Sequence, residues 1–112
     1  MNTPLASIKE NINRVILKIN EMKMIQEAEK RRLLTLIQMT ANTVTENEKK
    51  IWLRTKVGKP MVQSFQDSTD KLLRVFDVEN PKLDDVTAAM NDVDVNANKI
   101  GEESRRRSMV VT

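Results

Sequence analysis

The sequence predicts an all-α protein of the helical-bundle or coiled-coil type, and three observations support this. The first 57 residues contain one proline, Pro4, and no glycine, so little in them interrupts a helix. Aliphatic residues recur there at intervals of three and four positions, which places them on one face of a helix. The whole chain has two glycines and three prolines, which leaves few of the turns that an all-β fold requires.

A long amphipathic helix is expected over residues 4–57. Thr3 is a suitable N-cap, and Pro4 suits the first helical position because its missing N–H costs no hydrogen bond there. Two aliphatic stripes follow, the first formed by Leu5, Ile8, Ile12, Val15, Ile19 and Met22, and the second by Leu34, Ile37, Ala41, Val44 and Ile51. Residues 40–48 are rich in Thr and Asn, which are weak helix formers, so this helix is either continuous or broken near residues 40–46.

Two shorter helices are expected after the Gly58-Lys59-Pro60 interruption, where glycine can cap one helix and proline can open the next. Asn80-Pro81 has the form of a second helix entry. From Gly101 onward no helical period is sustained. The expected organisation is therefore a helix over about 60–77, a helix over about 81–99, a single helical domain over 1–100 and a flexible basic tail over 101–112.

The residue inventory excludes several kinds of chemistry. The chain has no cysteine and no histidine, which rules out disulfides, thiolate catalysis, Ser-His-Asp catalysis and the usual zinc sites. Asp92, Asp94, Asn96 and Glu103 match part of the ligand spacing of a calcium loop, but Ala97 stands where that loop needs glycine. We therefore expect no enzyme activity, no metal, no cofactor and no small-molecule substrate.

The N-terminus lacks a basic region followed by a continuous apolar run, so no signal peptide is expected. The longest apolar run in the chain is three residues, which is too short for a transmembrane segment. A cytoplasmic or nuclear location is the resulting expectation.

The aliphatic stripes dominate the functional interpretation. They form a longer apolar surface than two shorter helices can cover, which indicates burial against another chain. The favoured function is a non-enzymatic interaction or scaffold subunit that assembles with itself or with other proteins through a coiled-coil-like seam. The candidate interface residues are Ile12, Ile19, Ile37, Val44, Ile51 and Trp52.

A second interpretation comes from the uneven charge of the chain. Residues 1–60 hold 12 Lys and Arg against 6 Asp and Glu, whereas residues 61–112 hold 7 against 10. Cations surround Trp52, which could be buried, anchor a protein interface, or contact nucleic acid or lipid. The candidate basic patch consists of Lys49, Lys50, Arg54 and Lys56. The alternative function is a basic adaptor that binds nucleic acid or an acidic membrane surface.

Two further features leave the functional class open. Met22, Met24 and Met39 suggest a methionine groove, which would suit a small helical assembly chaperone. Ser108 follows three arginines, a pattern that basophilic kinases favour, so it is a candidate phosphorylation site.

Overall fold

The computed structural model describes residues 4–23 and 25–110, with side chains described up to Ser108. This part of the chain contains helices and no strand, so the predicted all-α class is confirmed. The elements are α1 (Ala6–Glu21), α2 (Glu27–Asn47), the short 3₁₀ helix η1 (Ile51–Arg54), α3 (Gly58–Val75) and α4 (Leu83–Val110).

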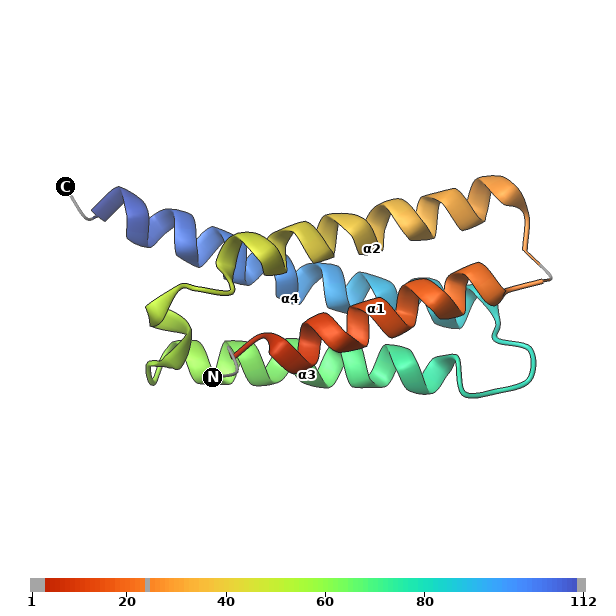
Figure 1. The fold of residues 1–112 in the computed structure, drawn as a ribbon, viewed down its shortest axis with the longest axis horizontal. Helices are drawn as coiled ribbons and strands as arrows, with labels where there is room; N and C mark the ends of the chain where they lie inside the picture. The colour runs from red at the N-terminus through yellow and green to blue at the C-terminus, as the bar shows by residue number, and fades with distance from the viewer. Residues whose placement is uncertain (1–3, 24, 111–112) are drawn as a thin grey trace.

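The four α-helices form an elongated bundle with extents of 50 × 24 × 22 Å. Helix α1 packs against α2 and α3, and α4 packs against the same two helices. Successive helices run in opposite directions along the bundle (Figure 1). The α2–α3 connection therefore links two diagonally opposed helices, and it crosses the end of the bundle where α1 begins and α4 ends.

The expected long helix over residues 4–57 is wrong, because the chain folds back at residues 22–26. Met22 and Gln26 adopt extended backbone angles that end α1 and precede α2. Both stripes contribute to one core as a result, since α1 and α2 now pack against each other. A continuous rod would have left these apolar surfaces in water, which costs more free energy than a five-residue connection.

The alternative break near residues 40–46 does not occur either, and helix α2 runs through this segment to Asn47. The hydroxyls of Thr40, Thr43 and Thr45 each donate a hydrogen bond to the carbonyl oxygen four residues earlier. These bonds satisfy the polar side chains within the helix. The burial of Ile37, Thr40 and Val44 against the rest of the bundle offsets the weak intrinsic helix propensity of threonine.

At the C-terminal end, α4 continues to Val110 instead of ending near residue 99. The expected flexible tail is thus helical over residues 101–110, and residues 111–112 lie outside the described part. Ile100 and Ser104 are buried on this extension. Their tertiary contacts outweigh the low helix propensity of Gly101.

The core combines apolar residues of all four α-helices with Trp52 and Leu53 of the 3₁₀ helix. A polar contact joins α1 to α3 beside this core. The Asn11 side chain, which is 7% exposed, donates hydrogen bonds to Thr69 Oγ1 at 3.0 Å and Asp70 Oδ1 at 2.8 Å. Such a satisfied polar contact favours one register of α1 against α3, because a shifted register would leave the amide unpaired.

Candidate functional site

The crossing segment, residues 48–57, carries the most distinctive surface of the molecule. It lies over one end of the bundle and contains η1 (Figure 1). Trp52 and Leu53 are 8% and 1% exposed, whereas Ile51 is 83% exposed and Val57 is 53% exposed. Within η1, the three-residue turn of a 3₁₀ helix explains why Ile51 is exposed while Trp52 and Leu53 are buried. Adjacent residues point in different directions, whereas Ile51 and Arg54, three positions apart, share one side.

Trp52 anchors this segment to α4. Its indole Nε1 donates a hydrogen bond to Ser104 Oγ at 2.8 Å, and both residues are buried. The guanidinium of Arg107 lies 5.1 Å from the centre of the tryptophan ring, which is within the range of a cation–π interaction. The indole is therefore held at its edge and on its face by two residues one helical turn apart.

Glu103 completes the anchor by holding two arginines of α4. Arg106 donates hydrogen bonds to its carboxylate, and Arg107 Nε lies 3.3 Å from Glu103 Oε1. The hydrogen bonds from Arg106, together with the positive charges of Arg106 and Arg107, lower the pKa of Glu103 below its ordinary value. The stabilisation from this ion pair is present at neutral pH and is lost as the pH falls through the lowered pKa.

Thr55 closes the crossing segment against the start of α3. Its hydroxyl donates to the carbonyl oxygen of Trp52 at 2.6 Å and accepts a hydrogen bond from the Gly58 N–H at 3.2 Å. One side chain thus satisfies a carbonyl of η1 and a free N–H in the first turn of α3. The segment is held at both ends of η1, so its outward-facing residues are presented by a defined backbone.

Five exposed cations project from this end of the molecule. The residues of the predicted basic patch, Lys49, Lys50, Arg54 and Lys56, are all exposed on the crossing segment, and Lys59 is exposed in the first turn of α3. We call these five residues the basic end. Within the described chain, none of them forms an ion pair with a carboxylate. Their charge is therefore available to a ligand.

A depression beside the basic end extends it onto α4. Lys50 and Glu46, near the C-terminal end of α2, line it together with Arg105 and Ser108 of α4. Ser108 is exposed there, next to two cations and one carboxylate. Sequence reasoning missed the link between the arginines and the crossing segment, because it assigned residues 101–112 to a tail.

The residues predicted to contact a partner lie mostly in the core. Four of them are no more than 1% exposed and pack within the chain's own bundle: Ile12, Ile19, Ile37 and Val44. Trp52 is buried in the anchor, and Ile51 is the exposed member of the set. A partner could reach the four core residues only if the bundle opened.

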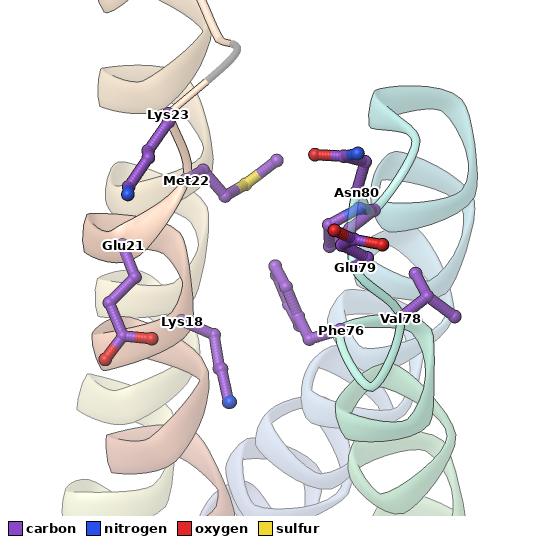
Figure 2. Close-up of a pocket in the computed structure, with 9 residues that line it drawn as sticks. Lys18, Glu21, Met22, Lys23, Phe76, Val78, Glu79 and Asn80 are labelled. Carbon is purple, nitrogen blue, oxygen red and sulfur yellow. The ribbon is translucent and has the colours of Figure 1, made fainter.

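A second hollow lies at the opposite end of the bundle, between the end of α1 and the α3–α4 connection (Figure 2). The Phe76 ring stands between the two sides of this hollow, with Met22 above it. Lys18 and Lys23 line it together with Glu21 and Glu79, so neither sign of charge dominates. This mixture gives no selective site for an anion or a cation.

The fold and the basic end define a class: a small four-helix bundle whose diagonal connection carries a cluster of cations. Within residues 4–23 and 25–110, none of the helices combines the length and apolar character needed to cross a bilayer. Comparison with protein-family models, curated protein sequences and solved structures finds no match to this chain.

The anchor makes a testable prediction about coupling between Trp52 and Ser104. Ser104→Ala should lower the free energy of unfolding by about 1–3 kcal/mol, because it leaves a buried indole N–H without an acceptor. The same change in a Trp52→Phe background should cost less, since no donor remains. Urea unfolding of the four proteins, followed by far-UV circular dichroism, measures the difference, and strictly additive costs would contradict the contact.

Proposed function

We propose that this chain is a non-enzymatic helical interaction protein, which binds an acidic partner through the basic end of a self-contained bundle. The observation that carries the proposal is the set of five exposed cations without intramolecular carboxylate partners, held on an anchored segment. Clustered charge of one sign attracts ligands of the opposite sign and raises their rate of association. The bundle buries most residues of its two apolar stripes within one chain, so this proposal requires no partner along them.

Negative charge in the depression beside the basic end would weaken this binding. A phosphate on Ser108 would lie in the same depression as Lys50 and Arg105, and its negative charge would reduce the attraction of the basic end for an acidic ligand. Glu46 in that depression already opposes the cations in part, whereas Glu48 is paired with Lys9 at 3.3 Å.

The second candidate function is assembly with another chain along the α1–α2 face. A shallow hollow between these helices is lined in part by Ile16, Leu34 and Met39, and Met39 is 56% exposed. Leu17 of α1 is a further exposed apolar residue, at 61%. Apolar side chains of this kind favour a helix-to-helix contact with a second protein. A methionine-based assembly chaperone would use the same face through Met39, whereas Met24 lies outside the described residues.

The charge proposal is tested with two variants, each of which removes four positive charges by substitution with glutamine. Changing Lys49, Lys50, Arg54 and Lys56 to glutamine should weaken equilibrium binding to heparin, used as a polyanion probe, by about tenfold or more, because nearby charges act together. The binding of the unchanged protein should weaken with added salt. The matched control changes Lys18, Lys23, Arg32 and Arg74, four exposed cations near the opposite end.

The control should keep the affinity of the unchanged protein within about twofold, since its four charges lie more than a Debye length from the basic end. Circular dichroism verifies that both variants stay helical. An equal loss in the two variants would contradict the proposal, because net charge and not the basic end would then govern binding.

A further inference from the structure

We infer that the acidic partner is an anionic membrane surface, into which Ile51 and Val57 insert while the basic end contacts the lipid headgroups. This inference rests on the proposed function, since it assigns a ligand class to the same five cations. It also uses an observation that charge alone does not explain. Two large aliphatic side chains, 83% and 53% exposed, project from the segment that carries most of those cations.

The exposure of Ile51 is specific to the way the crossing segment is anchored. The neighbouring residues Trp52 and Leu53 fill the end of the core, and the Trp52–Ser104 hydrogen bond fixes which side of η1 faces inward. Ile51 is consequently held away from the protein next to Lys49 and Lys50. A single exposed aliphatic residue is ordinary on a protein surface, but two on one ten-residue cationic segment make that segment amphipathic. We call this segment the tip.

The chemistry of this tip favours lipid over single-stranded nucleic acid. Proteins that hold single strands combine cations with exposed aromatic rings on which bases stack. All three aromatic residues of this chain are buried, at 8% exposure for Trp52, 0% for Phe65 and 5% for Phe76. Aliphatic tips offer a base no stacking surface, whereas they are stabilised at the boundary between headgroups and acyl chains.

The composition of the tip also favours lipid over an acidic protein. The centres of protein interfaces are depleted in lysine and enriched in aromatic residues. Here four of the five cations are lysines, and the exposed apolar residues between them, Ile51 and Val57, are aliphatic. Clusters of four to eight Lys or Arg are typical of segments that bind anionic lipids. The crossing segment lies at one end of the bundle, where the C-terminal turns of α4 extend past it along the long axis, so it meets a flat surface when that axis is tilted (Figure 1).

The first experiment measures sedimentation of the full chain with two kinds of vesicle. One kind is phosphatidylcholine alone, and the other contains about one third phosphatidylserine, which supplies the negative surface that attracts cations. The protein should bind the phosphatidylserine vesicles and not the neutral ones. The double variant Ile51→Ser with Val57→Ser should lose about tenfold or more in vesicle partitioning, because its apolar insertion is removed.

The matched control is Leu17→Ser with Met39→Ser, which removes two exposed apolar side chains, one from α1 and one from α2. This control should leave vesicle partitioning unchanged. Heparin binding should be the same in both variants, since neither alters a charge. Vesicle binding that is unaffected by the Ile51 and Val57 changes, or equally affected by the control, would overturn the inference.

A fluorescent label locates the contact directly, since the chain has no cysteine and a single introduced thiol is modified uniquely. An environment-sensitive dye on Ile51→Cys should shift to the blue when phosphatidylserine vesicles are added, whereas the same dye on Leu17→Cys should not. A water-like spectrum at position 51 with bound vesicles would overturn the inference.

The failures of the two proposals can be told apart. Heparin binding through the basic end without vesicle binding would leave the proposed function standing and overturn the lipid assignment. Binding of RNA in preference to phosphatidylserine vesicles would overturn the lipid assignment in the same way. If the unchanged protein bound neither heparin nor phosphatidylserine vesicles, both the proposed function and the lipid assignment would be overturned.

Discussion

Replacing Gly58 by alanine should lower the free energy of unfolding by at least about 3 kcal/mol, which is at the upper end of the cost of overpacking. Gly58 lies in the first turn of α3, directly against η1. A Cβ atom there would collide with the carbonyl oxygen of Trp52 and lie 2.6 and 2.7 Å from Leu53 Cα and the Leu53 carbonyl carbon. All three are backbone atoms, which cannot rotate away as a flexible side chain does.

Gly101→Ala is the matched control, because it makes the same chemical change in another helix. A Cβ at Gly101 would lie 3.8 Å from Thr43 Cγ2, an ordinary van der Waals distance. The higher helix propensity of alanine should then stabilise the protein by about 0.5–1 kcal/mol. Urea unfolding by far-UV circular dichroism compares the two variants. Similar stability changes at the two glycines would contradict the close approach of α3 to η1.

The second large effect is expected from Ile12→Asp combined with Ile37→Asp. The two isoleucines are 1% and 0% exposed in the core between the helices. Truncating such a residue to alanine costs about 2–5 kcal/mol, and an unpaired buried carboxylate costs more. Because a domain of this kind has a total stability of about 5–15 kcal/mol, the double variant should be unfolded.

This variant also separates a core from a partner interface. Unfolding would appear as loss of the helical circular dichroism signal, whereas residues used only for contact with a partner would leave a folded, helical monomer in size-exclusion chromatography with light scattering. Leu17→Asp combined with Met39→Asp is the control, since both residues are more than half exposed. The control should stay folded, and an equally unfolded control would contradict this assignment of the core.

The helical class could be predicted because periodicity is a local property of the sequence. The residues of the first stripe from Leu5 to Ile19 recur every three or four positions, and all of them are buried in α1 or just before it. The absence of glycine and proline between residues 5 and 57 also correctly indicated helix over most of that length. The aliphatic period and the lack of glycine and proline can both be read without knowing which other segment covers the stripe.

The fold-back at residues 22–26 and the helical course of residues 101–110 depended on tertiary contacts. No glycine or proline marks the fold-back in the sequence. It is favoured because an antiparallel α1–α2 pair packs the two stripes against each other within one chain. Helix α4 continues through Gly101 because Ile100 and Ser104 are buried, and Ser104 accepts a hydrogen bond from Trp52 of the crossing segment. The fold-back and the extended helix were both decided by burial of residues against segments that are distant in the sequence. A local sequence pattern carries no information about such contacts.

The candidate site shows the same division. Its cations were recognisable from the sequence as a cluster, since Lys49, Lys50, Arg54 and Lys56 lie within eight positions. The sequence alone could not distinguish Ile51 from Trp52, because both are large, apolar and adjacent. Tertiary structure buried Trp52 and exposed Ile51, since the indole N–H has a buried acceptor in Ser104 and the 3₁₀ turn directs the preceding side chain into solvent.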